Sequence, residues 1–268
     1  MDLHSLYFPG PESSGTPLLV LHGLFGSSGN WRALAKQLAR HRDVYALDLR
    51  NHGQSPHADS MTFEDMAGDV GTFAKKTRLT HFDLLGHSMG GKVAMQLALT
   101  APDLVSRLIV ADIAPKSYPP RHQDVFRAIH ILSENIITQR NQADELVKDV
   151  LPNQATRLFL LTNLIRNEHG RFTWRVDMQA IENNYNAISD APSASVSTGL
   201  RYEKPTLFIR GEGSSYIQEK DVELIAHLFP NYRLHTITSA GHWVHAEQPT
   251  QFLKTVELFL NTSDLENT

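Results

Sequence analysis

Short apolar runs alternate along the chain with stretches of helical periodicity. The first run, Pro17–His22, ends in Gly23 and is typical of a strand that is buried on both faces of a parallel sheet. Five similar runs follow, at Asp43–Asp48, Phe82–Gly86, Leu108–Asp112, Thr206–Arg210 and Arg233–Thr238. Helical stretches lie between most of them, at Trp31–Arg40, Phe63–Thr77 and Lys92–Thr100. This alternation predicts an α/β fold with a doubly wound, mostly parallel sheet.

The alternation stops between about Pro115 and Pro205, where helical patterns follow one another without a strand. These patterns lie at Asp124–Leu132, Ala143–Leu151, Ala155–Ile165 and Asp177–Ile188. We therefore expect a core of residues 1–115 and 199–268, interrupted by a helical insertion of residues 116–198. The alternative is a set of additional helices that cover the sheet.

Composition and charge narrow the class of protein. The chain has 268 residues, 41% hydrophobic and 20% charged, as in one globular domain. Its net charge is −4 and its Lys and Arg residues are scattered, which argues against a nucleic-acid partner. It has no cysteine, so disulfides and thiolate catalysis are excluded. We see no export signal and no membrane-spanning apolar run, and we expect a cytoplasmic protein without a membrane span.

The sharpest motif is GHSMGG at 86–91, which directly follows one predicted strand and precedes a predicted helix. This context is typical of a nucleophile elbow, a strand-to-helix turn so tight that its serine adopts a strained backbone conformation. Gly86 and Gly90 fit this turn, because larger side chains there would strike the neighbouring strand and helix. The motif therefore identifies Ser88 as the candidate nucleophile.

A serine hydroxyl needs a base to remove its proton, and 14 histidines compete for that role. His242 is the best candidate, because it follows the last predicted strand in a loop and precedes the C-terminal helix expected at Gln248–Leu260. His245 is the rival, and its alternative role is packing or hydrogen bonding at the start of that helix.

A carboxylate must orient the base, and the position where an aspartate is often found holds Ser214. Asp112 ends a predicted strand and so emerges at the same edge of the sheet as Ser88, which makes it our choice. Glu212 remains the alternative acid, and the alternative role for Asp112 is capping at the start of its loop.

Two backbone amides should form an oxyanion hole. One is that of Met89, directly after the nucleophile, and the other should come from the glycine-rich loop that follows the first predicted strand. In that loop we choose Leu24, with Phe25 as the alternative.

The sequence does not contain the motifs of a metal site or of a nucleotide-binding site. The histidines near these motifs are accompanied neither by H-E-x-x-H nor by carboxylates at ligand spacing, so we expect no metal. The glycines of residues 23–29 do not match a phosphate-binding loop, so we expect no nucleotide or other cofactor.

The polar turn at Asp48–Ser55 is expected to hold the neighbouring loops together through hydrogen bonds. Trp243 either lines the substrate pocket or packs under the loop that contains it. Aromatic residues of the insertion, such as Phe159, are expected in the core of the insertion.

With these motifs assembled, the chain resembles the α/β-hydrolase superfamily, and more narrowly the YbfF-type bacterial esterases and related abhydrolase-domain proteins. The resemblance rests on the segments HGLFGSSGNW, DLRNHGQS, GHSMGGKVAMQLA, VADIAP and AGHWVHAEQP. It implies the α/β-hydrolase fold with a helical cap inserted after the sixth strand. It also implies that Asp112, in the VADIAP segment, supplies the acid, in agreement with the choice made from the residues.

The resemblance implies a serine hydrolase that cleaves carboxylic esters or acyl-CoA thioesters through an acyl-enzyme on Ser88. The expected partner is a small-molecule acyl ester or thioester. A cofactor-free perhydrolase or a carbon–carbon bond hydrolase would keep the same triad, because fold does not fix chemistry. A third alternative, from another class, is a ligand-binding α/β-hydrolase that has lost catalysis.

Overall fold

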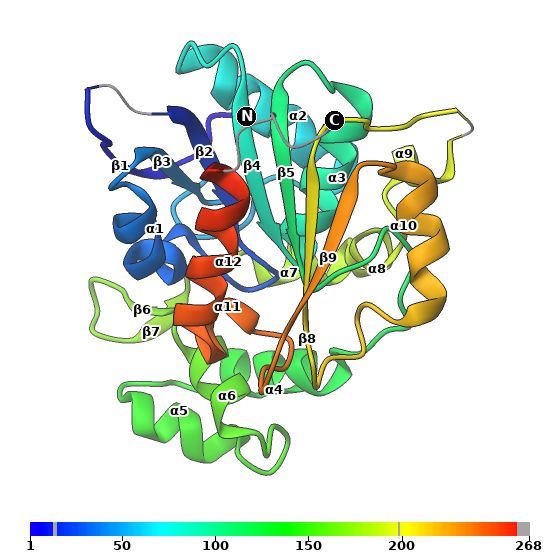
Figure 1. Ribbon diagram of the computed structural model, residues 1–268. Helices are drawn as coiled ribbons and strands as arrows, with labels where there is room; N and C mark the ends of the chain where they lie inside the picture. The colour runs from blue at the N-terminus through cyan, green and yellow to red at the C-terminus, as the bar shows by residue number, and fades with distance from the viewer. Residues whose placement is uncertain (13–14, 198, 262–268) are drawn as a thin grey trace.

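The computed structural model describes residues 1–12, 15–197 and 199–261, and Figure 1 shows a central sheet between layers of helices. The seven strands of this sheet lie in the order β1-β3-β2-β4-β5-β8-β9. Their bounds are β1 Ser5–Phe8, β2 Gly15–Leu21, β3 Arg42–Leu47, β4 Phe82–His87, β5 Val105–Ala111, β8 Thr206–Gly211 and β9 Tyr232–Ile237. All neighbours are parallel except β1, which pairs antiparallel with β3. The predicted mostly parallel, doubly wound sheet is confirmed.

Both faces of the sheet are covered, which explains why its central strands β2, β4, β5 and β8 are mainly apolar. Leu18 and Val20 of β2 belong to a buried cluster with Trp31, whereas Leu19 and Leu21 belong to a second cluster on the other face. The helices that contribute to the first cluster are α1 Arg32–Leu38, α11 Val244–Glu247 and α12 Pro249–Asn261. Those that contribute to the second include α2 Phe63–Lys76, α3 Met89–Thr100 and α10 Val222–Leu228.

The insertion lies between β5 and β8 and is mainly helical. Its helices are α4 Gln123–Glu134, α5 Arg140–Val147, α6 Gln154–Leu161, α7 Met178–Asn183, α8 Tyr185–Ser189 and α9 Ser193–Val196. Figure 1 shows α4, α5 and α6 together at one end of the sheet. The expected end of the insertion, Thr198, and residues 262–268 at the end of the core lie outside the described residues.

Three details of the insertion differ from the sequence prediction. It follows the fifth strand, not the sixth, because within the described residues a single antiparallel strand, β1, precedes the parallel ones. The helix expected at Ala155–Ile165 ends early, because its last residues instead form β6 Leu164–Arg166, which pairs antiparallel with β7 Phe172–Trp174. The helix expected at Asp177–Ile188 is divided into α7 and α8 at Asn184, a residue whose side chain donates to the main-chain oxygen of Asp59 (2.6 Å).

No helix among the described residues is both long enough and apolar enough to cross a membrane.

Candidate active site

Ser88 occupies a strained turn between β4 and α3. Its φ is 52° and its ψ is −119°, a conformation that non-glycine residues rarely adopt. The Ser88 amide donates to the main-chain oxygen of Ala111 in β5 (3.0 Å), which ties the turn to the next strand. Strain of this kind persists only where the surrounding structure enforces it, so the turn holds the Ser88 hydroxyl in a fixed position.

Gly86 and Gly90 are required by the packing of this turn. A methyl group on Gly86 would lie 2.2 Å from the main-chain oxygen of Gly90. One on Gly90 would lie 2.5 Å from the main-chain oxygen of His22, just after β2. Both contacts are with backbone atoms, which cannot move aside as a side chain could. The structure therefore agrees with the physical reason inferred from the sequence.

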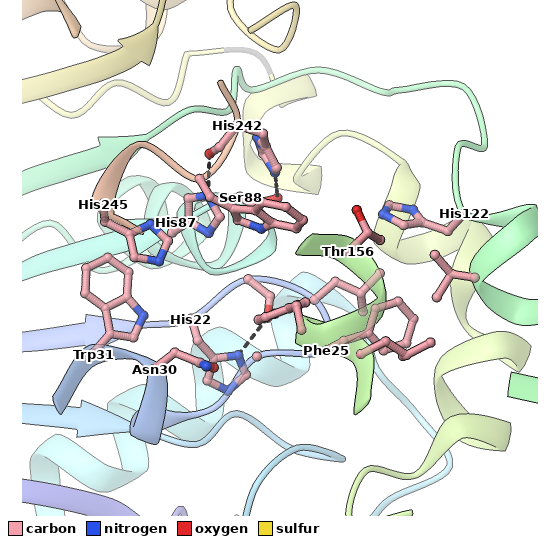
Figure 2. Close-up of a pocket in the computed structure, with 17 residues that line it drawn as sticks. His22, Phe25, Asn30, Trp31, His87, Ser88, His122, Thr156, His242 and His245 are labelled. Atoms are coloured by element: carbon pink, nitrogen blue, oxygen red, sulfur yellow. Dashed lines mark hydrogen bonds between the residues drawn. The ribbon is translucent and has the colours of Figure 1, made fainter. Parts of the chain in front are cut away.

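His242 lies against Ser88, as Figure 2 shows. Its Nε2 atom is 3.0 Å from the Ser88 hydroxyl oxygen, and its Nδ1 atom is 2.7 Å from Asp112 Oδ2. The ring of Tyr216 stacks on the His242 imidazole with 3.9 Å between ring centroids and an interplanar angle of 18°. Contacts with a serine, a carboxylate and an aromatic ring thus fix the orientation of this imidazole.

Asp112 is the carboxylate that reaches the imidazole. Its side chain is fully buried at the end of β5, and it accepts hydrogen bonds from the Gly211 amide (3.1 Å) and the Ser214 hydroxyl. Glu212, the alternative acid, is exposed and accepts from the Ser239 amide instead (3.0 Å). Sequence reasoning missed the contribution of Ser214, although its place in the loop, where an aspartate was expected, was the available signal.

The loop after β2 contacts the turn that carries Ser88. A methyl group on Gly23 would lie 3.3 Å from Ser88 Cβ, so this backbone passes directly beside the serine. The Phe25 amide donates to His52 Nε2 (3.1 Å) and is therefore already engaged. In the part of the chain that the structure describes, the Leu24 amide has no hydrogen-bond partner. The Met89 amide begins α3 and so has no acceptor within its helix.

Buried histidines surround the site but differ from His242 in their contacts. Burial lowers the pKa of His52 and His245 to about 3 and that of His122 to about 4. Burial also holds the pKa of His87 well below its ordinary value. These rings are neutral at neutral pH and serve as fixed hydrogen-bonding or stacking groups.

His245, the rival base, does not reach Ser88. Its ring stacks on Trp31 with 4.3 Å between ring centroids, away from Ser88, as Figure 2 shows. The packing role that we considered for His245 is the one that its contacts support.

The polar turn after β3 braces the loop beside Ser88. Asp48 accepts hydrogen bonds from the amides of Ser28 (2.6 Å) and Gln54 (2.9 Å), and His52 accepts from the Phe25 amide. The turn thus connects two loops through buried polar contacts, as expected from the sequence.

A cavity of about 680 Å³, part of it open to solvent, begins at Ser88. Core and insertion both line it, the insertion through residues of α6 and the region where α4 begins, including His122, Thr156 and Phe159. Trp243 also lines it and contacts Phe159, with 5.6 Å between ring centroids. Our expectation that Phe159 lies in the core of the insertion was wrong, because the side chain is only partly buried and faces this cavity.

Comparisons with known proteins identify the family to which this fold belongs. A family model described as the alpha/beta hydrolase fold matches residues 16–249. The chain is 37% identical over 258 residues to the sn-1-specific diacylglycerol lipase ABHD11 of Danio rerio, covering 93% of this chain and 80% of that protein. It is 33% identical over 251 residues to the esterase YbfF of Escherichia coli, covering 93% of this chain and 95% of that one.

A solved structure shows the same similarity in three dimensions. The structure of a marine microorganism esterase has a TM-score of 0.89 and 39% sequence identity to this chain. The match covers 96% of this chain and 99% of that one, so it includes both the core and the insertion.

Proposed function

The chain belongs to the α/β-hydrolase fold family and is a hydrolase of the esterase and lipase kind, and from this premise we propose that it cleaves acyl esters through an acyl-enzyme on Ser88. The observation that carries the proposal is the continuous chain of contacts from Asp112 through His242 to Ser88. In this arrangement, a buried carboxylate orients an imidazole, and the imidazole contacts the serine hydroxyl. Such an arrangement activates a serine for acyl transfer.

In the proposed reaction, the Ser88 oxygen attacks the carbonyl carbon of the ester while His242 Nε2 accepts the hydroxyl proton. Asp112 holds the imidazole in the tautomer that can accept this proton and stabilises the imidazolium that results. The amides of Leu24 and Met89 donate to the oxyanion. His242 then protonates the departing alcohol or thiol. Water, deprotonated by the same imidazole, attacks the acyl-enzyme and releases the acid.

The cavity that contains Phe159 and Trp243 suits an uncharged acyl chain. Its lining includes aromatic and aliphatic side chains from both the core and the insertion, among them Leu24, Val125 and Leu160. Apolar lining stabilises a bound hydrocarbon by removing it from water. Esters and acyl-CoA thioesters both present such a chain, so both belong to the proposed substrate class.

A turnover panel tests the proposal directly. The substrates are p-nitrophenyl esters from acetate to palmitate together with short and long acyl-CoA thioesters, and Ser88→Ala is the matched control. We expect wild-type turnover of at least one ester series and its near-complete loss in the variant. A fluorophosphonate probe should label the wild type at Ser88 and leave the variant unlabelled.

Two results would contradict the proposal. The first is retention by Ser88→Ala of about a tenth or more of wild-type activity, because loss of a triad nucleophile costs far more than this. The second is labelling of Ser88 without turnover of any ester or thioester, which would favour the perhydrolase or ligand-binding alternatives.

A further inference from the structure

A second cavity meets Ser88 on the side of α3. It contains about 440 Å³ of empty space, including space open to solvent, and Ser88, Leu24 and His122 line it as well as the first cavity. Its other walls come from α3, from the segment between β5 and α4, from α8 and from the loop after β8. The two groups that an ester joins therefore have two separate spaces next to the nucleophile.

The two cavities differ in charge. Among the described residues, the first cavity is lined by no Lys, Arg, Asp or Glu. The second is lined by Lys92 and Arg121 and by no Asp or Glu. Three tyrosines, Tyr118, Tyr185 and Tyr216, also line it. A small cavity lined by an arginine and a lysine and by no acidic side chain favours an anion.

Arg121 supplies the permanent charge. Its side chain is exposed at the second cavity, its Nη1 atom donates to the Ser215 hydroxyl (3.2 Å), and its guanidinium lies over the Tyr216 ring at 5.3 Å. No carboxylate in the described ranges forms an ion pair with it. Since a guanidinium has five N–H donors, most of them stay available for a ligand.

Lys92 is the buried cation of this cavity. Its Nζ atom donates to the main-chain oxygens of Ser189 (3.1 Å) and Asp190 (2.5 Å), and only 2% of the residue is exposed. An ammonium has three donors, so one remains after these two bonds. Burial lowers the pKa of Lys92 to about 7. An anion bound beside it would favour the protonated form.

The nearby acids are already engaged. Asp112 accepts from His242 and Ser214, and Asp221 pairs with Lys116 at 2.6 Å. The charge of Asp190 favours protonated Lys92, and its carboxylate accepts from the Ser117 hydroxyl and the Ala191 amide (2.8 Å). None of these carboxylates pairs with Arg121, so the charge of Arg121 is left for a ligand.

We propose that the second cavity binds an anionic group of the substrate through Arg121, so that the preferred esters carry a carboxylate or phosphate close to the scissile bond. This inference rests on the proposed function, since it assigns one part of the ester to each cavity. The uncharged part would occupy the cavity of Phe159 and Trp243. The anion belongs either to the acyl group or to the leaving group, and matched substrate pairs distinguish these two sources.

The experiment compares kcat/KM within each pair. For the acyl arm, the pair is p-nitrophenyl hydrogen glutarate and p-nitrophenyl valerate. For the leaving-group arm, it is butyryl glycerol phosphate and butyryl glycerol. Each pair is measured for the wild type, for Arg121→Gln and for Arg127→Gln, an exposed arginine that lines neither cavity.

In one of the two substrate pairs, we expect Arg121→Gln to lower the ratio of kcat/KM for the anionic ester to kcat/KM for the neutral ester about fivefold. This factor corresponds to the loss of one partly exposed ion pair. Arg127→Gln should leave that ratio unchanged. Added KCl should lower the wild-type ratio, because salt screens an exposed charge. An unchanged ratio in Arg121→Gln in both arms would overturn the inference. Failure of the wild type to cleave any of the four esters would instead count against the proposed function.

Discussion

Asp112→Asn should nearly abolish turnover and leave the fold in place. The carboxylate accepts three hydrogen bonds, from His242 Nδ1 (2.7 Å), the Gly211 amide (3.1 Å) and the Ser214 hydroxyl. Asparagine has the same shape, and it is among the few residues that tolerate the positive φ of 53° found here. The substitution therefore changes the chemistry of the side chain more than its packing.

The size of the effect follows from the hydrogen-bond partners. The Gly211 amide needs an acceptor, so the amide oxygen of the new side chain stays on that side and its NH₂ group faces His242 Nδ1. An N–H group facing Nδ1 requires that nitrogen to be unprotonated, which moves the ring proton to Nε2, toward Ser88. This tautomer cannot accept the serine proton, and in other triads the same error lowers kcat about 10⁴-fold. That factor corresponds to about 5 kcal/mol of activation free energy.

The assay measures kcat and KM with p-nitrophenyl acetate for the wild type, Asp112→Asn and the matched control Glu212→Gln. Thermal denaturation of the three proteins reports the fold. We expect near-wild-type kcat for Glu212→Gln and melting temperatures within a few degrees of one another. A larger loss of kcat in Glu212→Gln than in Asp112→Asn would refute the assignment of the acid.

Three further predictions concern packing, specificity and pH. Gly90→Ala should lower the free energy of unfolding by about 1–3 kcal/mol, because its methyl group would lie 2.5 Å from a backbone oxygen; urea denaturation measures this. Phe159→Ala should widen the first cavity and raise the ratio of kcat/KM for long acyl esters to kcat/KM for short ones. An unchanged ratio would show that Phe159 does not contact the acyl chain. Burial lowers the pKa of Lys92 to about 7 in the folded protein, so the unfolded chain binds more protons between pH 7 and about pH 10. As the pH rises across this window, the unfolding free energy of the wild type should therefore increase relative to that of Lys92→Met, by up to about 1.4 kcal/mol per pH unit. If the two proteins differed in unfolding free energy by the same amount at pH 7 and at pH 9, this prediction would be contradicted.

Six of the seven strands of the main sheet were predicted, because each has an apolar run of its own; β1, which has four residues, was not predicted. Burial on both faces makes most residues of a central strand such as β5 apolar, and this pattern needs no knowledge of the partners. The short hairpin of β6 and β7 has no such signal, since each of its strands contains three residues. A run that short cannot be distinguished from the end of a helix by periodicity.

The site was predictable where a local turn fixes it. The positions of Gly86, Ser88 and Gly90 follow from the turn between one strand and one helix, which lies within a few residues of sequence. The part played by Ser214 did not follow, because its hydroxyl acts on Asp112, 102 positions earlier in the chain. The wall formed by Phe159 was missed for the same reason, since only the folding of the insertion over the sheet brings it near Ser88.

The alternating strands and helices, the strained turn of Ser88 and a short set of candidate partners follow from the amino-acid sequence alone, because they depend on neighbouring residues. The tertiary structure decided which histidine reaches the serine, 154 positions away, and which carboxylate reaches that histidine, 130 positions away. It did so through the order β4-β5-β8-β9, which brings the carboxyl ends of four parallel strands to one edge. It also decided that two cavities of different charge meet at Ser88, because their walls come from segments that contact one another only after the insertion has folded onto the core.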